Sequence, residues 1–288
     1  MEAMHNKQLG VLYILCSGFF FASVMLFIKL AGPLPTMQKA LFRNIIALGI
    51  ALIILGTTKT PFRWKKQDFP ILFLRGLAGT IGLVANFYAV DHLILSDATI
   101  LNKLAPFFVI IFSLIFLKEK VTIVQMLLVV GAFLGASLVV KPTFSNTELF
   151  PYLIGILGGL GAGAAYTCVR VLGNRMVPAP VIVAFFSLFS TLVILPFVIV
   201  EHQSMQASQI LFLLLAGISA AGGQFSITKA YSYAPAKEIS VYDYTQILFA
   251  SLLSIFFFSE YPDATSIGGY IIVTGMAILM FLYNKRKA

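Results

Sequence analysis

The chain of 288 residues is 59% hydrophobic and only 11% charged, whereas an average globular domain has about 25% charged residues. Apolar segments of about 20 residues, the length that crosses about 30 Å of hydrocarbon, follow one another along the whole chain. This composition predicts an integral membrane protein and excludes a separate soluble domain. The net charge of +9 is explained below by the placement of the basic residues.

Ten membrane-spanning segments can be drawn in chain order, joined by short connections. They are 9–30, 37–55, 70–90, 98–117, 121–140, 151–172, 181–200, 209–231, 239–258 and 267–283. The short polar segment before the first span leads directly into it, so no cleaved signal peptide is expected. Cys16 and Cys168 both fall inside spans, which argues against a disulfide framework.

Basic residues gather on one side when the connections are assigned alternately to the two membrane faces. One side receives Lys7, the 59–66 loop, Lys118, Lys120, Arg175, Lys237 and residues 285–287. The other side has Lys29, Lys39 and Lys141 beside Asp91, Asp97, Glu148, Glu201, Glu260 and Asp263. Basic residues near span ends resist translocation, so both termini are predicted to be cytoplasmic, in the cell (inner) membrane. This asymmetry makes a nucleic-acid partner unnecessary.

Two stretches of the chain repeat each other. Residues 96–120 align without a gap with residues 237–261, and Glu119 meets Glu260 at an offset of 141, which is 260 minus 119. Because five spans per half is an odd number, the second copy must be inverted in the membrane. We therefore predict an all-α membrane protein with ten transmembrane helices as two five-helix inverted-topology repeats. The first repeat is residues 1–145 (spans 1–5) and the second is residues 146–288 (spans 6–10).

These stretches resemble the ten-helix EamA-type branch of the drug/metabolite transporter superfamily. The matching residues are Ser96 through Pro106 to Lys118-Glu119-Lys120 with Gly131, Asp243-Tyr244-Thr245-Gln246 through Glu260 with Gly275, and Arg43. The resemblance implies a secondary transporter with a central cavity lined by spans 3, 4, 8 and 9 and flanked by spans 1, 2, 6 and 7. It does not fix the substrate, since the family spans amino acids, nucleotide-derived metabolites, vitamins and toxic compounds.

Ionisable residues inside spans are functional candidates, because a charge in the hydrocarbon costs roughly 2.5–3.5 kcal/mol on insertion scales. Lys103 either snorkels to the outer surface or faces the cavity. Asp243 either accepts a cationic substrate group or carries a proton, or it pairs locally with Lys229 or Lys237. Depth counted along each helix separates Lys103 from Asp243 by more than about 10 Å, so no direct salt bridge is expected.

Hydrogen-bonding side chains surround these two residues on the predicted helices. The predicted substrate-binding residues are Asn86, Tyr88, Asn102, Lys103, Tyr166, Gln224, Tyr242, Asp243 and Gln246. Each polar side chain alone could equally join helices. Arg43 is left between a structural role and anion binding, and Arg75, Arg170 and Lys229 are expected to snorkel. Pro106 is expected to remove a mid-span hydrogen bond that Ile247 leaves intact in the second half.

No enzyme signature is present, so no catalytic residue, metal site or cofactor is predicted. The sequence predicts a secondary transporter of a small organic metabolite, an amino acid or related compound, working by alternating access in the lipid bilayer. Export is favoured by the resemblance, with proton or potential coupling, as a monomer or homodimer. The alternatives are uptake of a vitamin-like or nucleoside-derived solute stacked on tyrosines, and a membrane-embedded receptor or enzyme.

Overall fold

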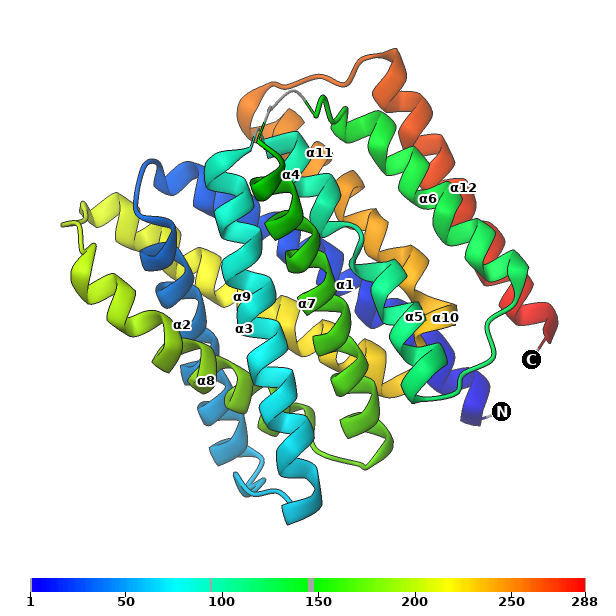
Figure 1. Cartoon of the computed structure of the whole chain (residues 1–288), viewed down its shortest axis with the longest axis horizontal. Helices are drawn as coiled ribbons and strands as arrows, with labels where there is room; N and C mark the ends of the chain where they lie inside the picture. Colours follow the sequence, from blue (N-terminus) through cyan, green and yellow to red (C-terminus); the bar gives the residue numbers. More distant parts are fainter. Residues whose placement is uncertain (1, 94, 145–147, 288) are drawn as a thin grey trace.

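The computed structural model describes residues 2–93, 95–144 and 148–287, which fold into helices joined by short connections (Figure 1). Ten helical segments of this described part are long and apolar enough to cross a membrane, as predicted. In chain order the elements are α1 (Glu2–Ala31), α2 (Thr36–Thr57), η1 (Lys66–Asp68), α3 (Phe69–His92), α4 (Leu95–Asn102), α5 (Ala105–Phe116), α6 (Ile123–Val140), α7 (Leu149–Asn174), α8 (Ala179–Val200), α9 (Ala207–Tyr233), α10 (Ala236–Ile239), η2 (Ser240–Tyr244), α11 (Thr245–Phe258) and α12 (Ala264–Lys287).

Helices are the expected solution for these apolar segments, because hydrocarbon offers the backbone no hydrogen-bond partners. Large apolar side chains such as Phe116, Ile199 and Phe256 are exposed on the outside of the helix assembly. In a soluble protein such exposure would be a liability, whereas lipid tails solvate these side chains. The fold is therefore built for a bilayer on its outer surface as well as in its segment lengths.

The helices pack in pairs that are preserved when the two halves are exchanged. α1 packs on α9 as α7 packs on α3, and α1 contacts α11 as α7 contacts α5. The pairs α6 with α12 and α2 with α8 lie at opposite edges of the molecule (Figure 1). At the offset found in the sequence, α7 is the counterpart of α1 and α9 that of α3, so the contacts confirm a duplicated architecture. The domain boundary after residue 145 lies outside the described residues and stays a prediction.

Helices α3 and α7 cross with their backbones in contact. A Cβ atom on Gly161 would lie 2.7 Å from Gly82 Cα, and one on Gly82 would lie 2.9 Å from the Ala162 amide nitrogen. Both obstacles are backbone atoms, so no side-chain rotation could relieve them. Small residues of α3 and α7 thus let the two helices approach closely at this crossing.

Two spans are interrupted at equivalent places. α4 ends at Asn102 and α5 begins at Ala105, while the ninth span consists of α10, the 3₁₀ turn η2 and α11. Pro106 stands in the first turn of α5, where a backbone amide has no acceptor within its helix. The expectation that Pro106 removes a hydrogen bond from a helix interior was therefore wrong. The expected asymmetry was also wrong, because the half that carries Ile247 is interrupted as well.

The two interruptions are hydrogen-bonded to each other. Lys103 Nζ donates to the carbonyl oxygen of Asp243 at 3.1 Å, and the Tyr244 hydroxyl donates to the carbonyl oxygen of Lys103 at 3.1 Å. Lys103 and Tyr244 are equivalent positions of the two repeats. Each half thus supplies a side chain to a carbonyl at the break in the other half, which lowers the cost of irregular backbone inside the membrane.

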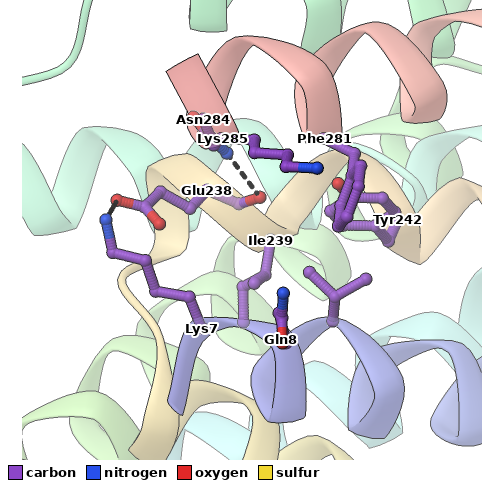
Figure 2. Close-up of a pocket in the computed structure, with 9 residues that line it drawn as sticks. Lys7, Gln8, Glu238, Ile239, Tyr242, Phe281, Asn284 and Lys285 are labelled. Atoms are coloured by element: carbon purple, nitrogen blue, oxygen red, sulfur yellow. Dashed lines mark hydrogen bonds and ion pairs between the residues drawn. The ribbon is translucent and has the colours of Figure 1, made fainter. Parts of the chain in front are cut away.

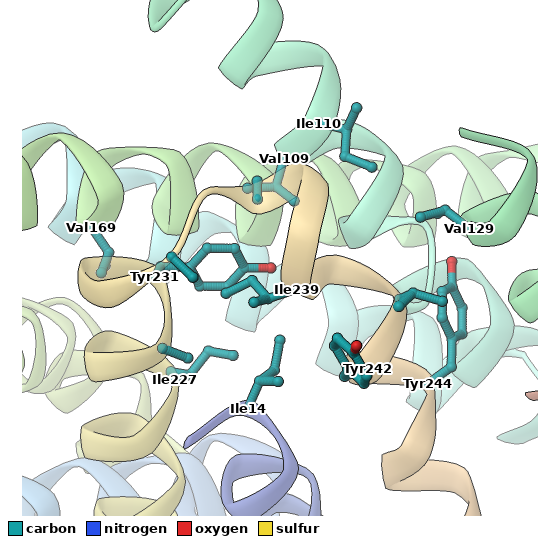
Figure 3. Close-up of a cluster of buried hydrophobic side chains, with 14 of the residues drawn as sticks. Ile14, Val109, Ile110, Val129, Val169, Ile227, Tyr231, Ile239, Tyr242 and Tyr244 are labelled. Atoms are coloured by element: carbon teal, nitrogen blue, oxygen red, sulfur yellow. The ribbon is translucent and has the colours of Figure 1, made fainter. Parts of the chain in front are cut away.

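Both termini lie on one side of the molecule, called here the terminal side (Figure 1). A cluster of buried apolar side chains lies between the helices on this side. Figure 3 shows Ile14, Val109, Val169, Ile227 and Ile239 converging from α1, α5, α7, α9 and α10, and all five are buried. The protein is therefore closed on the terminal side.

A partly buried ion pair and its neighbouring hydrogen bonds reinforce this closure. Arg170 Nε lies 3.3 Å from Glu119 Oε1, and the Arg170 guanidinium also donates to the carbonyl oxygens of Tyr231 and Ser232. The expectation that Arg170 snorkels was wrong, because these acceptors hold the side chain between helices. Lys229 likewise donates to a neighbouring side-chain hydroxyl at 3.3 Å.

Candidate functional site

A cavity lies between the two halves, beginning at the interrupted spans and extending away from the terminal side. It encloses about 970 Å³ of empty space, counting its open mouth. α1 contributes only residues 21–28, from the half of that helix far from the N-terminus. Side chains of α2, α3, α7, α8 and α9 and of both interrupted spans complete the wall. These are the spans that the family resemblance implied.

Most of the predicted substrate-binding residues lie on this wall. They are Asn86, Asn102, Lys103, Tyr166, Gln224, Asp243 and Gln246. The structure thus brings together polar side chains from five separate helical spans. Their part in binding stays a prediction.

Tyr88 and Tyr242 are not among the residues that line the cavity. The Tyr88 ring stacks on His92 with 3.9 Å between ring centroids. Tyr242 lines a separate pocket of about 440 Å³ on the terminal side, with Glu238 and Asn284 (Figure 2). Tyr88 follows Asn86 by two residues and so points about 200° away from it around the helix. The helical period was therefore a signal in the sequence that Tyr88 and Asn86 do not face the same cavity.

Lys103 and Asp243 form a salt bridge with Nζ 2.9 Å from Oδ2. The expectation of no direct contact was wrong, because depth was counted along continuous helices and both spans are interrupted at this point. Lys103 Nζ also donates to Gln246 Oε1 at 2.7 Å and to the Asp243 carbonyl oxygen, so its three protons all have acceptors. Lys103 is only 4% exposed and does not snorkel.

The local partners proposed for Asp243 are occupied elsewhere. Lys229 donates to the Tyr13 hydroxyl, and Lys237 donates to the carbonyl oxygen of Lys120. Asp243 therefore faces the cavity wall with Lys103 as its cation. This pair ties the first half to the second at the floor of the cavity.

Two arginines that sequence reasoning did not place in the site also line the cavity. Arg75 is 2% exposed, donates from Nη2 to Gln224 Oε1 at 3.1 Å and stacks its guanidinium 4.0 Å from the Phe186 ring centroid. The expectation that Arg75 snorkels was wrong, because the span predicted from the sequence began at residue 70 whereas the helical span begins at residue 66 and so carries Arg75 deeper. The Nε atoms of Arg43 and Arg75 are buried without a hydrogen-bond partner among the described residues.

Gly79 makes room for the Arg75 side chain. A Cβ atom at Gly79 would lie 2.2 Å from Arg75 Nη1 and 2.8 Å from Phe186 Cε2. Because Gly79 follows Arg75 by one helical turn, the guanidinium can lie against the surface of its own helix. The position of this charge at the cavity wall thus depends on the missing Cβ atom.

Ion pairs on the side opposite the termini are much more exposed than those on the terminal side. Lys29 Nζ lies 2.8 Å from Glu260 Oε1, and Lys141 pairs with Asp263, with all four side chains about half exposed. The hydrogen bond from Lys29 lowers the pKa of Glu260, and that from Lys141 lowers the pKa of Asp263. Exposed pairs of this kind contribute little stability. The cavity side is therefore held less firmly than the terminal side.

Comparison with known proteins decides the family. The model of the EamA-like transporter family matches residues 8–141 and again residues 149–282, the same offset that the repeat shows. The chain belongs to the EamA-like transporter family.

Two relatives whose names state a transport role match this chain over almost its whole length. The pseudopaline exporter CntI of Pseudomonas aeruginosa (strain UCBPP-PA14) is 33% identical, covering 96% of this chain and 97% of its own. The solute carrier family 35 member G1 of Mus musculus is 28% identical, covering 96% of this chain and 80% of its own. A solved crystal structure with 14% identity covers 95% of this chain and 98% of its own with a TM-score of 0.85, which shows the same fold.

As an EamA-like transporter, the chain is a multi-pass membrane protein that moves a small solute and is not an enzyme. The cavity gives this family architecture a particular chemistry. Three cationic side chains, Arg43, Arg75 and Lys103, face it together with a single carboxylate, Asp243. All three cations come from the first repeat and the carboxylate comes from the second.

Proposed function

We propose that this protein exports a small organic metabolite, an amino acid or a related compound, across the inner membrane by alternating access. The observation that carries the proposal is the charged cavity at the two interrupted spans. Transporters built from inverted repeats bind their solutes near the membrane midplane, where interrupted helices meet. The cross-bonded breaks at Lys103 and Asp243 lie at the floor of this cavity.

The conformation supports one half of a transport cycle. The cavity extends away from the terminal side, and the apolar cluster around Ile14 and Ile227 closes that side. With both termini in the cytoplasm, this arrangement is the outward-facing state. The inward-facing state would require the apolar cluster and the Arg170–Glu119 pair to open.

Export is supported by the 33% identity with a protein named as an exporter. The alternative of uptake of a vitamin-like or nucleoside-derived solute rested on stacking by Tyr88, Tyr166, Tyr242 and Tyr244. Of these four, only Tyr166 lines the cavity, and its ring already stacks on Tyr231 with 5.2 Å between centroids. Tyr244 is buried and donates to a carbonyl. The stacking alternative therefore loses its main support.

Transport by the purified protein in liposomes tests this proposal. A thermal-stabilisation screen over amino acids and related compounds selects candidates, and counterflow of the labelled candidate then measures exchange. We expect counterflow for wild type and for Ser204→Cys, a change in an exposed connection, and none for Asp243→Asn. Vesicles of known orientation give the direction, with proton gradient and potential imposed separately. A solute that stabilises the protein but never undergoes counterflow would contradict the proposal.

A further inference from the structure

The cavity wall carries more positive than negative charge, which bears on the kind of solute that can bind there. Lys103 is neutralised by Asp243 and has acceptors for all its protons. Arg43 and Arg75 have no such counterion, since none of the ion pairs of the described residues includes either guanidinium. Two uncompensated cations therefore line one cavity in a low-dielectric setting, where an unpaired charge is costly.

Both arginines keep donors unused. Arg75 donates a hydrogen bond from Nη2 to Gln224, and its guanidinium stacks on the ring of Phe186. These contacts hold the guanidinium in place without neutralising its charge. The Nε atoms of both residues are buried and have no partner among the described residues. A guanidinium with free donors matches the two oxygens of a carboxylate, which accepts two parallel hydrogen bonds from it.

We propose that this cavity selects solutes that carry two carboxylates, one bound by Arg43 and one by Arg75, while the carboxylate of Asp243 balances the charge of Lys103. The inference rests on the proposed transport function and names the substrate class of that same site. An amino group on the solute fits the site as well, because Asn86, Asn102 and Tyr166 offer uncharged oxygen acceptors on the same wall. The class is thus dicarboxylic amino acids and their derivatives.

The net negative charge of such a solute also supplies a driving force for export. An interior-negative potential favours outward movement of an anion, by about 50-fold in concentration ratio for each net negative charge at 100 mV. A solute with net negative charge would then be exported without a coupling ion. Transport of this class should follow an imposed potential and be nearly indifferent to a proton gradient.

The test begins with the electrostatics of the cavity, which can be measured without knowing the solute. Met25 lines the cavity and is 46% exposed, so Met25→Cys provides a reporter thiol in a chain with Cys16→Ala and Cys168→Ala. Its rate of reaction with an anionic sulfonate methanethiosulfonate is compared with that of the cationic trimethylammonium analogue. Ser204→Cys, in an exposed connection, is the matched control.

We expect the anionic reagent to be favoured on the order of tenfold at the cavity thiol relative to the control thiol. Arg43→Gln and Arg75→Gln should each lower this preference, and Arg75→Lys should keep it. A preference at the cavity thiol no greater than at Ser204→Cys would overturn the proposal. This comparison uses proteins in which both arginines are intact, so its outcome does not depend on whether the arginine variants fold.

The second arm uses glutarate, its monoamide and its diamide, which share one carbon skeleton and carry two, one and no carboxylates. We expect protection of the Met25→Cys thiol to fall in that order. Equal protection by the diamide, or no protection by glutarate, would overturn the proposal. If the order holds but no solute undergoes counterflow in liposomes, the binding inference stands and the transport function falls. If neutral amino acids undergo counterflow and glutarate does not protect, the function stands and the inference falls.

Discussion

Breaking the Lys103–Asp243 pair offers a quantitative test of how the two halves are joined. Lys103→Met keeps much of the side-chain length and removes the charge, leaving the Asp243 carboxylate without its cation. The two side chains are 5% and 13% exposed. Removing one partner of a buried pair costs about 3–5 kcal/mol. Asp243 retains some access to the cavity, so we expect the lower value, about 3 kcal/mol.

Such a loss should lower the thermal midpoint in detergent by about 6–12 °C, since about 1 kcal/mol corresponds to 2–4 °C in chains approaching this size. Asp243→Asn leaves Lys103 with two neutral acceptors, Gln246 and the carbonyl of residue 243, so it should destabilise less while still abolishing transport. The double variant carries neither charge and should be more stable than Lys103→Met alone.

The measurement is the thermal midpoint of the four proteins in one detergent, with counterflow measured in parallel. A midpoint for Lys103→Met within about 1 °C of wild type would show that the pair contributes no net stability. A double variant less stable than both single variants would refute the reasoning from an unpaired buried charge.

The remaining predictions concern topology, packing and the break in the fourth span. Gln67→Cys should react with an impermeant thiol reagent only from the cytoplasm and Gln203→Cys only from outside; the reverse pattern would refute the assigned orientation. Gly161→Ala should separate α3 from α7 and lower the thermal midpoint by several degrees, because its Cβ would meet the backbone of Gly82, and an unchanged midpoint would contradict this. Pro106→Ala should change the thermal midpoint and counterflow very little, since Pro106 stands in the first turn of α5. Loss of counterflow in this variant would contradict the assignment of Pro106 as an ordinary helix-starting proline.

The sequence predicted the spans, the duplication and the family because each depends on patterns along the chain. Segment length and hydropathy follow from the thickness of the bilayer, and the offset between Glu119 and Glu260 follows from the duplication itself. Neither requires knowledge of how a helix is rotated or where it is interrupted.

The errors share one physical cause, which is that residues were placed as if each span were a continuous helix of known rotation. Nothing in the 237–246 stretch marks the turn η2, since the second repeat has Ile247 in place of Pro106. Rotation about the helix axis decided that Arg75 meets the cavity and that Tyr88 does not. The helical period separates Tyr88 from Asn86, but which of the two faces the cavity is set by packing between helices, which the sequence of one chain does not report.

The reciprocal hydrogen bonds between the two broken spans bear on leakage. A transporter whose cavity was open to both sides of the membrane at once would act as a pore, and ion gradients would dissipate through it. The carbonyl oxygen of Lys103 accepts a hydrogen bond from Tyr244, and the carbonyl oxygen of Asp243 accepts one from Lys103. Straightening the backbone at either break would therefore remove a hydrogen bond from the other break. We therefore expect the two halves to rearrange together, so that the alternating access proposed above would not pass through a state open to both sides.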